Sequence, residues 1–151
     1  MGESSDNPPA RPQLAHAVRD YLERERRRIL DTCTKCGKCS EVCPMTPYNE
    51  KKDGKSSQEL AAGVLNLLAT GTTDDAALGW IKACIRSGCC VPACPESVNP
   101  KLMMRLAKMI ATGGLGGPKH IPLKEDRDYY ARVRAFARLQ LSDQEYKDWM
   151  E

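Results

Sequence analysis

Apolar residues recur along this chain at intervals of three and four positions, and polar loops interrupt them at regular points. This spacing is typical of amphipathic helices. The predicted helices cover residues 13–31, 57–70, 74–84, 99–112, 125–139 and 142–150. The expected N-terminal caps are Ser57, either Thr73 or Asp74, either Asn99 or Ser97, and Ser142. No stretch alternates apolar and polar residues as a half-buried strand does, so the pattern predicts an all-α fold.

The same pattern divides the chain into three parts. Residues 1–12 are polar and rich in proline, and we expect a disordered tail there. Residues 13–112 are expected to form one domain that contains all eight cysteines. The glycine-rich segment 113–118 then opens a helical extension, 113–151, with Trp149 near its end. A docking arm for a partner is one interpretation of this extension, and packing back onto the domain is the other.

Composition narrows the classes of function. The chain has 23 basic and 20 acidic residues, a balance that argues against nucleic-acid binding. It has no apolar run of the roughly 20 residues that a transmembrane helix needs, and no hydrophobic export signal at its start. We therefore expect a cytoplasmic protein, or one held at a membrane surface through a partner. Eight cysteines in a reducing compartment are more often metal ligands than disulfides.

The first cysteine block reads Cys33-x2-Cys36-x2-Cys39-x3-Cys43, followed by proline. Three cysteines spaced by three residues wrap a tight turn, and their sulfurs point at three corners of one iron–sulfur cube. In proteins with two such clusters, the fourth cysteine ligates the other cluster. Gly37 is expected to let the backbone pass close to an inorganic sulfide of the cluster that the first block holds. A zinc site and a disulfide framework are the alternatives, but zinc sites usually use paired cysteine knuckles.

The second block reads Cys84-x4-Cys89-Cys90-x3-Cys94, again followed by proline. Aligned on the first block, it has Ser87 where Cys36 stands, and Cys89 is an additional thiol. If the last cysteine of each block ligates the cluster of the other block, the cysteines form one full set of four ligands and one short set of only three. The full set is Cys33, Cys36, Cys39 and Cys94, and the short set is Cys43, Cys84 and Cys90.

The short set leaves three alternatives open for the second cluster. It is a [3Fe–4S] cluster that needs only three thiolates, a [4Fe–4S] cluster completed by Cys89, or a [4Fe–4S] cluster completed by the Ser87 oxygen. Adjacent cysteines usually point in different directions, which argues against Cys89. In the first alternative Cys89 is simply a small buried residue.

The two blocks, about 40 residues apart, resemble the alpha-helical ferredoxin domain over residues 13–112. That domain occurs in the C subunit of heterodisulfide reductase, in the iron–sulfur subunits of succinate dehydrogenase and fumarate reductase, and in glycolate-oxidase-type proteins. Residues 90–100, CVPACPESVNP, are similar to the heterodisulfide reductase group. The spacing of Cys84, Cys90 and Cys94 resembles the [3Fe–4S] block of succinate dehydrogenase instead. The heterodisulfide reductase proteins normally have a cysteine at the position of Ser87.

The resemblance implies an electron-transfer subunit with two iron–sulfur clusters, one of them [4Fe–4S]. Its implied partner is a larger oxidoreductase subunit, either a cysteine-rich protein like the B subunit of heterodisulfide reductase or a flavoprotein. We do not expect the chain to be catalytic alone. Two other functions remain open, a catalytic centre at an incompletely ligated cluster and a purely structural scaffold. His16 and His120 have no partner at ligand spacing and are expected to be ordinary surface residues.

Overall fold

The computed structural model describes residues 11–121 and 127–150, and every regular element in these residues is a helix. The all-α expectation is therefore confirmed. The first helix begins at Arg11, so it includes the last two residues of the expected tail, whereas residues 1–10 lie outside the described residues. The elements are α1 Arg11–Thr32, α2 Lys38–Glu41, the 3-10 helix η1 Thr46–Tyr48, α3 Ser57–Thr70, α4 Asp75–Ala83, α5 Cys90–Ala93, α6 Pro100–Ala111, α7 Arg127–Gln140 and α8 Asp143–Met150.

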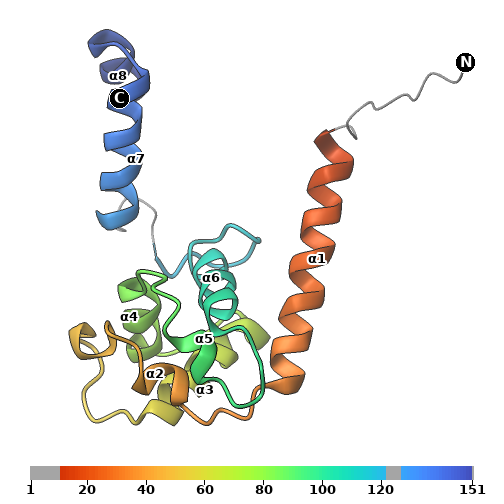
Figure 1. Ribbon diagram of the computed structural model, residues 1–151. Helices are drawn as coiled ribbons and strands as arrows, with labels where there is room; N and C mark the ends of the chain where they lie inside the picture. Colours follow the sequence, from red (N-terminus) through yellow and green to blue (C-terminus); the bar gives the residue numbers. More distant parts are fainter. Residues whose placement is uncertain (1–10, 122–126, 151) are drawn as a thin grey trace, which may run out of the picture.

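Helix α3 forms the centre of the core and packs against α1, α2, α4 and α6 (Figure 1). The side chains of Leu60, Val64, Leu67 and Leu68 on this helix are almost completely buried. Full burial of such a side chain stabilises a fold by roughly 1.5–3 kcal/mol relative to exposure. Helices α4 and α6 contribute further large core residues: Trp80, Ile81, Met103, Met104 and Leu106.

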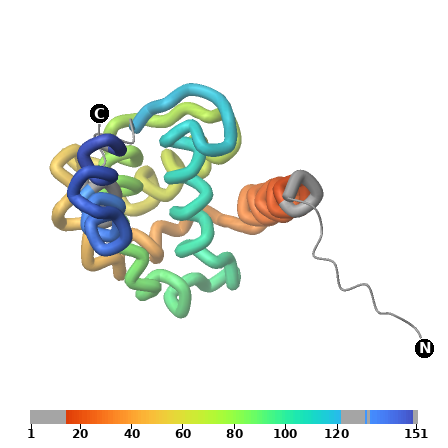
Figure 2. The backbone as a smooth tube through the Cα atoms, turned by 90° about the horizontal axis from the view of Figure 1, so that it is seen from above, coloured from red at the N-terminus to blue at the C-terminus, as the bar shows by residue number. Residues whose placement is uncertain are grey.

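Helix α1 is anchored to this core by its C-terminal part only. Ile29 is fully buried, whereas Val18 and Tyr21 on the preceding turns are about half exposed. The Arg26 guanidinium donates a hydrogen bond to the Leu68 carbonyl at the end of α3. The rest of the helix projects away from the other helices, as Figure 2 shows from above. The anchored end leads directly into the first cysteine block, so its packing positions Cys33.

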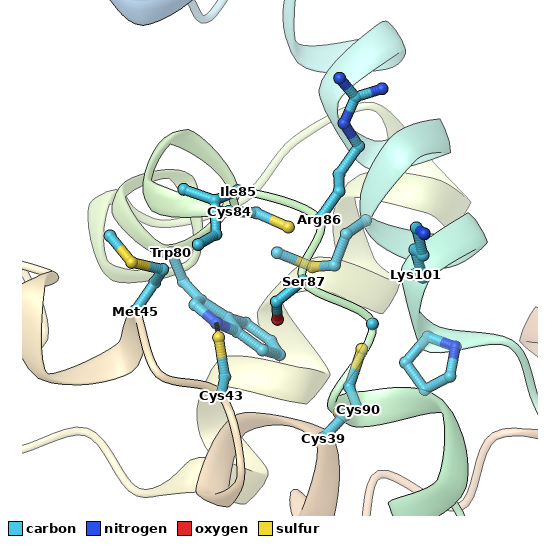
Figure 3. Close-up of a pocket in the computed structure, with 13 residues that line it drawn as sticks. Cys39, Cys43, Met45, Trp80, Cys84, Ile85, Arg86, Ser87, Cys90 and Lys101 are labelled. Atoms are coloured by element: carbon cyan, nitrogen blue, oxygen red, sulfur yellow. Dashed lines mark hydrogen bonds between the residues drawn. The ribbon is translucent and has the colours of Figure 1, made fainter.

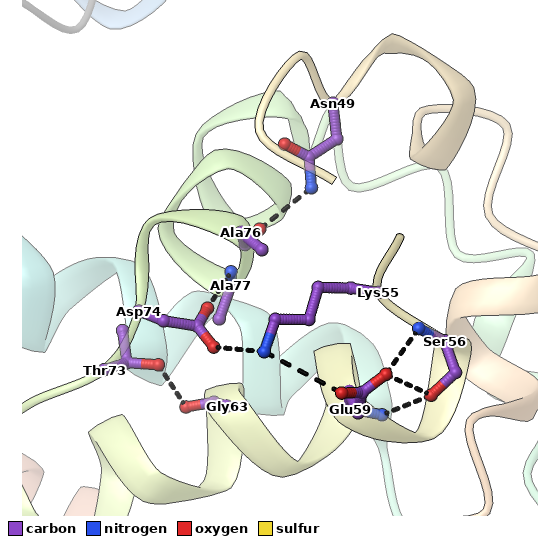
Figure 4. A network of polar contacts seen from close by, with 9 residues as sticks. All are labelled: Asn49, Lys55, Ser56, Glu59, Gly63, Thr73, Asp74, Ala76 and Ala77. Atoms are coloured by element: carbon purple, nitrogen blue, oxygen red, sulfur yellow. Dashed lines mark hydrogen bonds and ion pairs between the residues drawn. The ribbon is translucent and has the colours of Figure 1, made fainter. Parts of the chain in front are cut away.

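The starts of α3 and α4 are fixed by side-chain caps (Figure 4). The cap of α3 is Ser56 and not Ser57 as expected, because Ser56 and Glu59 form a reciprocal capping box. Asp74 caps α4 by accepting a hydrogen bond from the Ala77 amide. The Lys55 ammonium lies 3.8 Å from Glu59 and 3.5 Å from Asp74, and so links the two caps.

Asn99 caps α6, which decides between the two residues expected there. Ser142 and Glu145 form the expected cap in front of α8. Helices α7 and α8 pack against each other, and Arg138 lies over the Tyr146 ring. Phe136 and Trp149 remain exposed on this pair. The docking-arm interpretation therefore stays a prediction.

Candidate metal centre

The first cysteine block is a tight loop followed by a single helical turn. Helix α1 ends at Thr32, and the Cys33 amide still donates to the Ile29 carbonyl. Lys35 and Gly37 both have left-handed backbone, with φ of 59° and 79°. A Cβ on Gly37 would lie 2.7 Å from the backbone of α3, so the close approach of α3 also requires glycine here. This contact adds to the role expected of Gly37 from the sequence.

The second block repeats this backbone. Arg86 and Gly88 stand as far after Cys84 as Lys35 and Gly37 stand after Cys33, and their φ angles are 59° and 87°. A single helical turn again follows, α5 in place of α2, and these two turns pack against each other. A non-glycine residue with left-handed backbone is uncommon, so its occurrence at both matching positions shows that the two loops share one conformation. The internal repeat seen in the sequence is therefore present in the backbone.

A first cavity, of about 300 Å3 with the open space at its mouth, lies between the two blocks. Cys33, Cys36 and Cys39 of the first block and Cys94 of the second line it together. These are the four residues of the predicted full set. The remaining wall is formed by Gly37, Ala61, Val98, Pro100 and Met103.

A second cavity, of about 400 Å3 on the same measure, lies beside the first, and Cys39 and Pro100 line both (Figure 3). Cys43 of the first block and Cys84 and Cys90 of the second line it, which are the three residues of the predicted short set. Its other lining residues are Met45, Trp80, Ile85, Arg86, Ser87, Gly88, Lys101 and Met104.

Ser87 and Cys89 are placed very differently. The Ser87 hydroxyl points into the second cavity, among the sulfurs of Cys43, Cys84 and Cys90 (Figure 3). Cys89 is exposed and lines neither cavity. It is therefore not the buried residue that one alternative expected.

Several of these cysteine thiols have raised pKa values, because they are partly buried and lie close to one another. Burial, together with the charges of neighbouring Cys33 and Cys90, raises the pKa of the Cys39 thiol to about 12. Burial also raises the pKa of Cys33 and of Cys90. Such thiols do not ionise together at neutral pH unless a positively charged partner stabilises the thiolates. The donor set therefore suits a group that supplies positive charge at the sulfurs.

An iron–sulfur cluster and a single metal ion require different distances between the cysteine sulfurs. Four sulfurs bound to one zinc ion lie about 4 Å apart, since each Zn–S bond is about 2.3 Å. In the described part of the chain, no three His, Cys, Asp or Glu side chains are close enough together to hold a single metal ion. The cysteines instead line two adjacent cavities, each with cysteines from both blocks, and thiolates arranged in this way fit iron–sulfur clusters.

Two residues have surroundings that the sequence did not reveal. The indole N–H of Trp80 donates a hydrogen bond to the Cys43 sulfur at 3.5 Å. The only sequence signal for this contact is that Trp80 precedes Cys84 by one helical turn. His120 was expected on the surface, but it is half-buried and its Nε2 lies 2.6 Å from the Gly71 carbonyl oxygen. Its bond joins the segment after α6 to the end of α3.

Residues 26–66 match a protein family described as the 4Fe-4S dicluster domain. The matched stretch includes the end of α1, the whole first cysteine block and most of α3. No curated protein and no solved structure matches the chain at a significant level. Across the described residues, no helix combines the length and apolar character needed to cross a bilayer. The family match supports an iron–sulfur protein with a role in electron transfer.

Proposed function

We propose that this chain is the electron-transfer subunit of an oxidoreductase complex similar to heterodisulfide reductase. In this proposal it holds two iron–sulfur clusters and relays single electrons between a redox partner and a catalytic subunit. The main support is the pair of adjacent cavities, each lined by cysteines from both blocks. Two redox centres separated only by the Cys39 and Pro100 wall would be close enough for electron exchange.

The first cavity is proposed to hold a [4Fe–4S] cluster on Cys33, Cys36, Cys39 and Cys94. Its four thiols match the four irons of a cube. The remaining wall is apolar apart from backbone, and such a wall limits access of water to a bound cluster.

The second cavity is proposed to hold a [3Fe–4S] cluster on Cys43, Cys84 and Cys90. Ser87 stands at the repeat position of Cys36 and supplies a hydroxyl instead of a thiolate. Cys89 stands at the repeat position of Lys38, which lines no cavity either. Each cluster, when bound, would take up and release one electron. The residues of this chain hold the clusters, exclude water from them and set their potentials.

The partner and location follow from the same chemistry. A chain that only relays electrons needs a larger redox partner, and we propose either a cysteine-rich protein like the B subunit of heterodisulfide reductase or a flavoprotein. Thiols reserved for iron need a reducing compartment, so we propose the cytoplasm, with attachment to a membrane only through a partner.

The test is anaerobic iron and sulfide quantification combined with EPR of the oxidised and the reduced protein. The proposal expects about seven irons per chain and an oxidised signal at a g value of about 2, because a [3Fe–4S] cluster is paramagnetic when oxidised. About eight irons and no oxidised signal would refute the [3Fe–4S] assignment. Zinc in place of iron would refute electron transfer itself.

A second candidate function is favoured by the Ser87 position alone. A [4Fe–4S] cluster without a fourth thiolate can bind a small ligand at its open iron. Turnover by the isolated chain, or a change of its EPR signal with an added small anion, would support this catalytic function. A structural scaffold would instead show no reversible redox activity.

A further inference from the structure

Trp80 occupies a special place in the second cavity. Its side chain is only 2% exposed, and it stands on α4 one turn before Cys84. The indole ring lies against the cavity, and its N–H donates to the Cys43 sulfur at 3.5 Å (Figure 3). The bond joins α4 to the last cysteine of the first block, 37 residues earlier in the chain.

The chemistry of this bond suits a sulfur that ligates a cluster. An indole N–H can only donate, and a buried donor without a good acceptor destabilises the fold. A neutral thiol is a weak acceptor, whereas a thiolate accepts a stronger, charge-assisted bond. Trp80 is therefore best satisfied when Cys43 is a thiolate, which is the form of a cluster ligand.

The first cavity has no counterpart to Trp80. Apart from its cysteines, its lining consists of Gly37, Ala61, Val98, Pro100 and Met103, and none of these side chains has a polar hydrogen to donate. The second cavity has the Trp80 indole, whose N–H points at a cysteine sulfur. The two cavities therefore differ in the side chains that stabilise negative charge.

We propose that Trp80 is a positioning residue that raises the reduction potential of the second site through its N–H···S hydrogen bond to Cys43. This inference rests on the proposed electron-transfer function. Reduction adds one electron, supplied by the redox partner, to the site, and the added negative charge strengthens hydrogen bonds to sulfur. The reduced form therefore gains more from Trp80 than the oxidised form does.

The test is an EPR-monitored potentiometric titration of the full chain, with both sites followed in the same sample. Trp80→Phe keeps an aromatic ring and removes the donor. At a fixed potential, the ratio of reduced to oxidised second site should be about fivefold lower in the variant. This corresponds to a midpoint potential about 40 mV lower, at 59 mV for each tenfold change in the ratio. The first site serves as the internal control and should keep its midpoint. An unchanged or raised potential of the second site, or an equal shift at both sites, overturns the inference.

A second measurement does not depend on the stability of the Trp80 variant. The chain has two tryptophans, so indole-15N labelling introduces only two labelled rings. Pulsed EPR of the second site should detect a 15N coupling in the wild type and in Trp149→Phe, which leaves only Trp80 labelled. No coupling in a protein that shows the second-site signal overturns the inference. A protein without any iron–sulfur signal refutes the proposed function itself, so the two failures are distinguishable.

Discussion

Replacing Ser87 with cysteine tests the assignment of the second site most directly. The Ser87 side chain points into the second cavity, and its loop has the same left-handed positions as the loop of Cys36. A cysteine at 87 would therefore present its sulfur as Cys36 does in the first cavity. Ser87 is exposed, and substitutions at exposed positions usually change stability by less than about 0.5 kcal/mol. The effect on the cluster can thus be separated from an effect on folding.

Ser87→Cys is expected to increase the iron content by about one iron per chain. Four ligands assigned to the first cluster and three assigned to the second predict about seven irons, and a fourth ligand for the second cluster predicts about eight. Ser87→Cys should also abolish the oxidised EPR signal and add a second signal on reduction. The matched control is Cys89→Ser, which removes a thiol two residues away that lines neither cavity and should change nothing. Loss of iron in Cys89→Ser, or a Ser87→Cys protein that keeps the oxidised signal, would refute the reasoning.

Three further predictions concern single residues. Cys36→Ala should lose the first cluster, about four irons per chain, and an unchanged cluster absorbance would remove Cys36 from the ligand set. Gly37→Ala should lower the free energy of unfolding by about 2–4 kcal/mol, because a Cβ is strained in left-handed backbone and also clashes with α3. Its control is Gly71→Ala, which should lower the free energy of unfolding by only about 1–2 kcal/mol. Gly71 has left-handed backbone, with a φ of 77°, but no atom lies near its missing Cβ. Ser56→Ala should cost about 1 kcal/mol of stability through loss of the α3 cap, while Ser57→Ala should cost much less; equal losses in denaturant melts would contradict the assigned cap.

The sequence predicted what depends on local spacing. The three- and four-residue periodicity placed all the long helices, including α7, whose Phe136 and Leu139 side chains are exposed. The three-residue spacing of Cys33, Cys36 and Cys39 anticipated that these side chains would line one cavity. The alignment of the two blocks anticipated that Ser87 would face the second cavity.

The features that the sequence missed depend on contacts between distant residues. The Trp80 bond to Cys43 spans 37 residues and exists only because α4 packs beside the first block. His120 is half-buried because the segment after α6 returns to the end of α3, where Gly71 lies. The choice of Ser56 over Ser57 as cap depends on which serine Glu59 can reach, a difference of one residue at a helix end.

The exchange of cysteines between the blocks also bears on how this fold is stabilised. Cys94 belongs to the second block but lines the first cavity, and Cys43 belongs to the first block but lines the second cavity. Neither proposed ligand set can be complete until α2 and α5 have packed against each other, so metal binding at either site favours the same chain arrangement. The free energy of binding a metal group at a site absent from the unfolded chain is also free energy of folding. The two sites are therefore expected to be lost together on unfolding rather than one after the other.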